Sequence, residues 1–164
     1  AAPFVPQLLS DIALITFFAA SDVLESNENG VDWHLRAYKA VDGLVPMAVP
    51  TDAPRFYRGF ECRWEEWADQ PVYDDPEIEV PAGFDCAGVH LDNVRRTKIG
   101  GYASNIQSQP WWGYQQHSAN PRFCLQIASE DKVGLMWGDC GAVYIARGTA
   151  LGREDEWFMD WQCY

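Results

Sequence analysis

The chain has 164 residues, of which 48% are hydrophobic and 22% charged, a balance typical of a folded domain rather than a disordered segment. Its net charge of −12 argues against nucleic acid or an anionic membrane as a partner, because both would repel it. Residues 1–4 lack the charged start of a signal peptide, and the apolar run 12–20 is too short to span a bilayer. The start without Met indicates a trimmed or processed N-terminus.

Cysteines and histidines limit the redox and metal chemistry that the sequence predicts. The five cysteines are odd in number and include no C-x-x-C pair, which is not the pattern of a disulfide framework. We therefore expect buried free thiols in a reducing compartment, the cytoplasm. The three histidines, His34, His90 and His117, lie far apart without metal-ligand spacing. We predict no metal and no cofactor.

The first part of the chain predicts strands. Residues 12–18 are rich in β-branched and aromatic side chains, as strands are. Turn residues at 27–30 precede an alternating run at 31–38, so the two runs together predict a β-hairpin. A further strand is predicted at 55–64, and a short helix at 64–68.

Acidic residues are concentrated in the middle of the chain. Residues 61–92 contain ten acidic residues and one basic residue, a net charge of −9 that leaves −3 for the rest of the chain. Two interpretations stay open: a solvated loop that aids solubility, or a docking face for a basic protein. In the second, aromatic anchors and carboxylates would contact the partner. The predicted partner-binding residues are Trp64, Glu65, Glu66, Trp67, Asp69, Tyr73, Asp74, Asp75, Glu77 and Glu79.

The last part of the chain predicts further β-structure. The pair Gly100 and Gly101 permits a turn or a close backbone approach. Strands are predicted at 122–128 and 157–163, with a short helix before Arg95.

A weak internal repeat relates the two ends of the chain. Residues 9–17 align with 137–145, and Trp33 aligns with Trp157, at separations of 128 and 124 residues. The repeat is compatible with a duplicated hairpin. We therefore predict a β-rich fold of the α+β class with few short helices, in which antiparallel sheets are built from two similar, duplicated halves. The boundaries within one domain, 1–164, are 1–64 for the first half, 65–92 for the acidic insertion and 93–164 for the second half.

The stretch from Trp137 to Gly141, "WGDCG", lies between two apolar runs and reads as a turn or as a reactive loop. Gly138 and Gly141 can adopt backbone angles closed to other residues, and Asp139 can accept backbone hydrogen bonds as in an Asx-turn. A catalytic aspartate needs a partner, and only Cys140 stands beside it. We interpret the stretch as a structural turn.

No nucleotide-binding or serine-hydrolase motif occurs, and we predict no catalytic residues. Two alternatives stay open. One is an enzyme whose site is gathered by folding from Asp139, Cys140, His90 and Arg95 or Arg96. The other is a small-ligand or peptide-binding scaffold that uses Trp111 and Trp112, a pair whose other interpretation is packing of a loop onto the sheet.

Four segments carry a family resemblance: "TKIGGYASNIQ", "FCLQIASEDKVGLMWGDCGAVYIA", "WFMDWQCY" and, more loosely, "FYRGFECRWEEWADQPVYDD". Together they resemble the YwqG-like family, a bacterial domain family of unknown function. The sequence departs from that family's pattern at Ala103, where Pro is frequent, and at Ala128, where Asp is frequent. The resemblance implies a β-rich fold of two similar halves and no established activity.

Genes of the YwqG-like family often lie among bacterial toxin and immunity loci. The resemblance therefore implies an immunity protein that binds and neutralises a secreted bacterial toxin, such as a basic nuclease or deaminase effector of a secretion system, by occluding its active site. That inference is one of association rather than of site chemistry.

Overall fold

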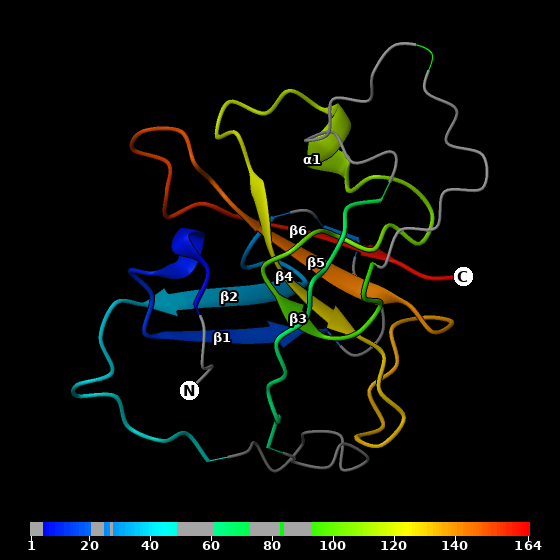
Figure 1. Cartoon of the computed structure of the whole chain (residues 1–164). Coiled ribbons are helices and arrows are strands. Elements are labelled where there is room, and N and C mark those ends of the chain that lie inside the picture. The colour runs from blue at the N-terminus through cyan, green and yellow to red at the C-terminus, as the bar shows by residue number, and fades with distance from the viewer. Residues whose placement is uncertain (1–4, 21–24, 27, 49–60, 73–82, 84–92) are drawn as a thin grey trace.

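The computed structural model describes residues 5–20, 25–26, 28–48, 61–72, 83 and 93–164, and its elements are labelled in Figure 1. It is β-rich, with two antiparallel sheets and almost no helix, as predicted. The elements in chain order are the 3₁₀ turn η1 (Gln7–Leu9), β1 (Leu14–Ala19), β2 (Trp33–Tyr38), β3 (Lys98–Ile99), α1 (Trp111–Tyr114), β4 (Arg122–Ala128), β5 (Ala142–Arg147) and β6 (Trp157–Gln162). None of the described helices is long and apolar enough to cross a bilayer.

Strands β1 and β2 form a two-stranded sheet, and a second sheet has the order β3-β4-β5-β6. The strands predicted at 12–18, 31–38, 122–128 and 157–163 correspond to β1, β2, β4 and β6, with shifts of at most two residues at their ends.

The helix predicted at 64–68 is wrong, because residues 61–72 form neither helix nor strand. Every residue from 61 to 68 is exposed, so no apolar face is buried to stabilise so short a helix. The predicted strand 55–64 is absent from its described part, 61–64, and its remainder lies outside the described residues. The helix predicted before Arg95 also falls mostly outside them, and 93–95 is irregular.

The internal repeat corresponds to two hairpins with the same register. Adding 128 to each β1 number and 124 to each β2 number converts every β1–β2 pair into a β5–β6 pair. Phe17 opposite Leu35, for example, becomes Ile145 opposite Met159. The aligned tryptophans Trp33 and Trp157 are both buried. The repeat seen in the sequence is therefore also a repeat of strand pairing.

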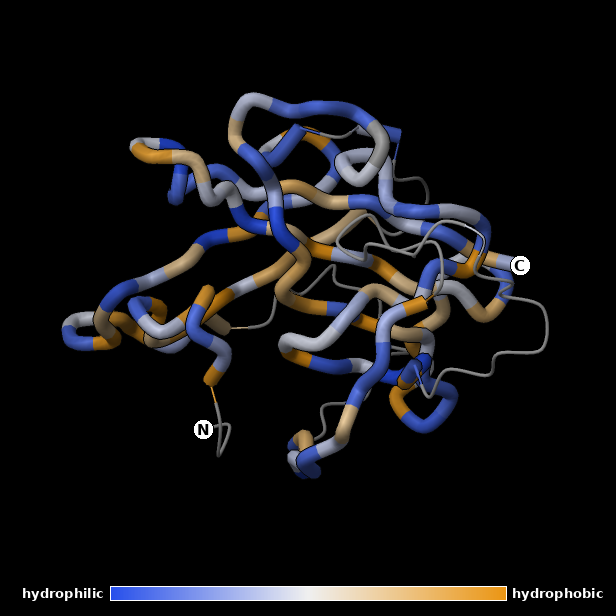
Figure 2. Tube along the Cα trace, turned by 45° about the horizontal axis from the view of Figure 1, so that its top comes forward, coloured by the Kyte–Doolittle hydropathy of each residue, from blue (hydrophilic) through white to orange (hydrophobic). Residues whose placement is uncertain are grey.

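The main core lies between the two hairpins, where each contributes its inward-facing alternate residues. Figure 2 shows apolar stretches along the strands in the middle of the molecule. The buried members of this core are Leu9, Trp33, Leu35, Cys124, Val143, Ile145, Trp157 and Met159. On the opposite face of the larger sheet, Tyr144 and Phe158 pack against Trp112 and a set of alanines. Both faces of β5 are therefore covered, and all six of its residues are buried.

Candidate functional site

The acidic segment is anchored to the body of the protein by Asp69. One carboxylate oxygen, Oδ1, accepts a hydrogen bond from the Val94 N–H at 2.7 Å. The other, Oδ2, accepts from the Tyr102 N–H at 3.0 Å and from Lys98 Nζ at 2.8 Å. The side chains of Asp69 and Lys98 are only 9% and 11% exposed, and burial lowers the pKa of Lys98 although Asp69 opposes the shift. Asp69, predicted to contact a partner, is thus placed in an internal ion pair.

The glycine pair opposite this anchor forms a bend and makes the predicted close approach. Gly100 and Gly101 have φ of +74° and +72°, in the left-handed region that favours glycine. A Cβ at Gly101 would lie 2.3 Å from Asp69 Oδ2, which leaves no space for a larger residue. Figure 1 shows the segment 61–72 running beside β3 toward this turn.

Before the anchor, the segment exposes aromatic and acidic side chains together. Trp64 is 37% exposed and Trp67 is 63% exposed, unusual values for tryptophan. Glu61 and Glu66 are exposed beside them, while Glu65 pairs with Arg63, an interaction that lowers the pKa of Glu65. The remaining predicted partner-binding residues, Tyr73, Asp74, Asp75, Glu77 and Glu79, lie outside the described residues.

The "WGDCG" stretch is a turn, as predicted. Gly141 N–H donates to the Trp137 carbonyl at 2.8 Å, and Gly138 and Cys140 have φ of +55° and +53°. The expected Asx-turn is wrong: the Asp139 carboxylate forms no hydrogen bond with the residues that the structure describes. The backbone closes the turn, and the Asp139 carbonyl accepts the Tyr164 N–H at 3.0 Å.

The residues of the alternative prediction, an enzyme site gathered by folding, come together only in part. Cys140 and Arg95 line one small pocket of about 250 Å³, together with Tyr164, whose hydroxyl accepts a hydrogen bond from Arg95. Asp139 does not line this pocket, and His90 lies outside the described residues. Among the described residues, no group of three or more His, Cys, Asp or Glu side chains is placed to hold a metal ion.

The thiols differ from the expectation of buried cysteines. Cys124 is buried, and burial raises its pKa to about 12, so this thiol is unreactive at neutral pH. Cys62 and Cys140 are exposed instead, because they lie in an irregular segment and a surface turn. Cys163 is half-buried, and Cys86 lies outside the described residues.

Trp111 and Trp112 pack the loop before β4 onto the larger sheet. The Trp111 indole Nε1 donates to the Met159 carbonyl at 2.9 Å, and its ring lies edge-on to Trp112 and Phe158 at 5.7 and 5.9 Å. Trp111 is thus occupied in packing. Trp112 is buried, but one side of it also lines a larger groove.

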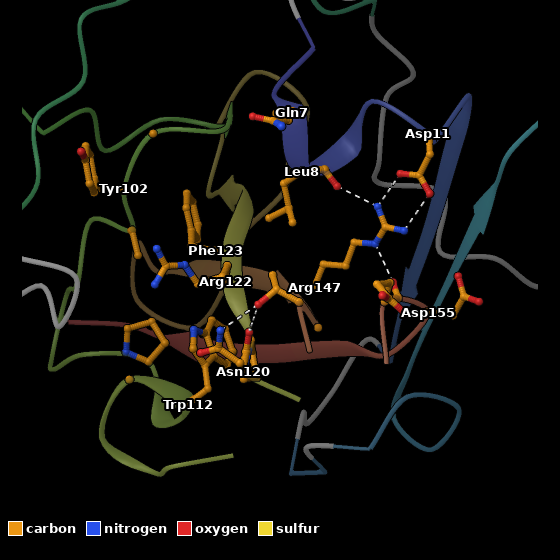
Figure 3. Close-up of a pocket in the computed structure, with 18 of the residues that line it drawn as sticks. Gln7, Leu8, Asp11, Tyr102, Trp112, Asn120, Arg122, Phe123, Arg147 and Asp155 are labelled. Carbon is orange, nitrogen blue, oxygen red and sulfur yellow. Dashed lines mark hydrogen bonds and ion pairs between the residues drawn. The ribbon is translucent and has the colours of Figure 1, made fainter. Parts of the chain in front are cut away.

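This groove, about 1190 Å³ in volume, was not predicted from the sequence. It lies where β4 begins and β5 ends, and η1 and the loop after β3 form its walls (Figure 3). Tyr102, Phe123 and Trp112 provide aromatic surface. The lining carries equal numbers of basic and acidic residues: Lys39, Arg122 and Arg147, and Asp11, Glu154 and Asp155. The only sequence signal for it is Arg147 itself, a charged residue that ends an otherwise apolar strand.

Arg147 contacts four residues of two distant chain stretches beside the groove. Its guanidinium donates to both carboxylate oxygens of Asp11, at 2.6 and 2.8 Å, and to the carbonyls of Leu8 and Glu154, at 2.7 and 2.6 Å (Figure 3). It also lies 5.6 Å from the centre of the Trp157 ring. The Arg147 side chain is 6% exposed, while that of Asp11 is 44% exposed. This ion pair is therefore buried on one side and open to water on the other.

The ion pair predicts a pH dependence of stability. The hydrogen bond from Arg147 lowers the pKa of Asp11 from 3.8 to about 2. A depressed folded-state pKa means that the stabilisation is complete above pH 3.8 and is lost as the pH falls through about 2. Because the carboxylate is 44% exposed, we expect this stabilisation to be only about 1 kcal/mol.

Urea unfolding of the wild type and of Asp11→Asn between pH 2 and 6 measures this effect. The free energies of the two proteins should converge toward pH 2 and separate above pH 4. Parallel curves across the whole range would show that Asp11 does not titrate with the fold. Asp155→Asn, at an exposed carboxylate 4.0 Å from Lys39, is the matched control.

In a comparison with known proteins, a family model matches residues 26–163 of the chain. It is described as "Domain of unknown function (DUF1963)". The match includes β2, the acidic segment, the glycine turn and the whole of the larger sheet. No curated protein and no solved structure matches the chain.

Proposed function

We propose that this protein binds a basic protein toxin and neutralises it as an immunity protein of the cytoplasm. The chain belongs to the DUF1963 family, whose function is unknown. The observation that carries the proposal is the exposure of Trp64 and Trp67 on a segment where Glu61 and Glu66 are also exposed. Tryptophans commonly provide the largest contributions to binding at protein interfaces, while surrounding charges set the association rate and specificity.

The anchor at Asp69 supports the same proposal. It fixes one end of the exposed segment through three hydrogen bonds, so part of the entropy cost of ordering a binding loop is met before the partner arrives. The net charge of −9 over residues 61–92 would attract a toxin whose substrate groove is positively charged. Neutralisation then follows from occlusion of that groove.

The sequence resemblance to the YwqG-like family adds support by association. Genes of that family are often neighbours of toxin and immunity genes. The protein encoded beside this gene is therefore the first partner to test.

We predict that Trp67→Ala weakens binding of the neighbouring gene product by about tenfold or more, because an exposed aromatic anchor is removed. Replacing both Glu61 and Glu66 by lysine reverses their charge. This change should weaken binding at low salt and make the affinity depend less on NaCl concentration. Isothermal titration calorimetry at two salt concentrations measures both effects. The same reversal at Asp74, Asp75 and Glu77 extends the test along the acidic segment.

The matched control is the double variant Glu25→Lys and Glu28→Lys, which changes the net charge equally at exposed sites outside the segment. Its affinity should stay close to that of the wild type. If the control and the segment variants lose affinity equally, total charge rather than this surface drives binding. If the neighbouring protein neither binds nor is neutralised in co-expression, the immunity proposal is rejected.

A further inference from the structure

Among the described residues, no strand covers the outer edge of β1, whereas β4 covers the equivalent edge in the second hairpin. β1 pairs with β2, and no other strand among the described residues pairs with it. Its equivalent β5 lies between β6 and β4. The two hairpins share one register, so the edge of β1 has the geometry that β5 uses to bind β4.

The burial of equivalent side chains in β1 and β5 shows the same difference between the two hairpins. Val143 and Ile145 of β5 are fully buried, whereas their equivalents Ile15 and Phe17 are only half-buried on the same side of the core. In the larger sheet, alternate residues of β4 pair with these two β5 positions: Ile127 with Val143, and Leu125 with Ile145. No described strand performs that role beside β1, although the Trp137 ring lies 6.4 Å from that of Phe17.

Side chains block the outer edges of β2 and β6, whereas no side chain in the described part of the chain blocks that of β1 in this way. On β2, Asn29 accepts from the Leu35 N–H at 2.9 Å and donates to its carbonyl at 3.0 Å. On β6, the carbonyl of Met159, which is the equivalent of Leu35, accepts from Trp111 Nε1. Strand β1 reads LITFFA, with no charge or proline of the kind that protects edges, and its Phe18 is 52% exposed.

We propose that the outer edge of β1 binds an extended segment of the basic protein partner by strand addition, antiparallel and in the register that β4 has on β5. The register places an apolar side chain of that segment opposite Phe17 and another opposite Ile15, as Leu125 and Ile127 lie opposite the equivalents of these residues. The identity of the partner rests on the proposed function. A second copy of this chain is disfavoured, because each copy carries a charge of −12.

The test uses a probe that does not depend on the toxin: a synthetic peptide with the sequence of β4, residues 122–128, in which Cys124 is replaced by serine. We expect saturable binding by fluorescence anisotropy and NMR shifts centred on β1. At saturation, amide exchange on the outer edge of β1 should slow by about tenfold or more, because each N–H there gains a hydrogen bond.

Two N-methylated peptides separate strand addition from unspecific apolar contact. In the larger sheet the Cys124 carbonyl accepts the Gly100 N–H, so position 124 faces β3 and positions 125 and 127 face β5. Methylation at 125 and 127 should therefore abolish binding, whereas methylation at 126 should leave it unchanged.

Four results would overturn the proposal: no saturable binding, equal binding of both methylated peptides, outer-edge amides of β1 already protected in the free protein, or a dimer through β1 in sedimentation. The third would mean that the chain covers its own edge, and the fourth that the occupant is a second copy. Because the toxin is absent from this experiment, each result is independent of whether the immunity proposal holds.

Discussion

Replacing Gly141 by alanine will destabilise the protein by about 3 kcal/mol or more, because two backbone oxygens occupy the space that a side chain needs. A Cβ at this position would lie 2.1 Å from the Gln162 carbonyl oxygen and 2.5 Å from that of Trp137. Neither oxygen can withdraw easily. One belongs to the end of β6, and the other accepts the hydrogen bond that closes the turn before β5.

Urea unfolding measures this loss, and Gly152→Ala provides the control. Gly152 has a φ of +79° but nothing within 4 Å of an added Cβ, so its alanine variant carries backbone strain without a clash. That strain costs about 1 kcal/mol. A Gly141→Ala variant no less stable than Gly152→Ala would contradict the steric argument.

Replacing Arg147 by methionine will destabilise the protein by about 2–4 kcal/mol. The variant keeps an apolar stem but removes the guanidinium that joins Asp11, Leu8 and Glu154. Breaking a fully buried ion pair costs more, about 3–5 kcal/mol, but Asp11 is half exposed and water can solvate it once it is unpaired. Arg147→Lys should recover only part of the loss, since lysine lacks the fixed fork of donors.

A double-mutant cycle with Asp11→Asn assigns this loss to the ion pair. The coupling between the two residues should be about 1 kcal/mol and should change little with salt, because the arginine is buried. A coupling near zero would mean that Arg147 acts through the two carbonyls and the Trp157 ring alone.

Patterns within a short window predicted most of the fold. Alternation and β-branched residues located β1, β2, β4 and β6, since each strand buries one face against a common core. The fixed separations of 128 and 124 residues anticipated the shared register of the two hairpins. The helix at 64–68 failed because helix formation depends on a buried face, and that segment has none.

The site was harder to predict, because its contacts join distant parts of the chain. Asp69 stands in an acidic run and resembles its exposed neighbours, yet its three partners come from residues 94–102. Arg147 and Asp11 are 136 residues apart, and nothing near either one indicates the other. The groove they border is therefore a property of the folded chain, while the exposed tryptophans belong to a segment that the sequence did single out.

The anchor at Asp69 has a consequence for how the protein can diversify. Residues 61–68 are exposed and irregular, so substitutions there cost little folding energy. Lys98, Gly101 and Asp69 fix where this stretch leaves the body of the protein, whatever side chains it carries. Sequence drift can thus change the surface of this stretch while the scaffold keeps its stability, an arrangement that would suit the proposed binding of a toxin that also evolves.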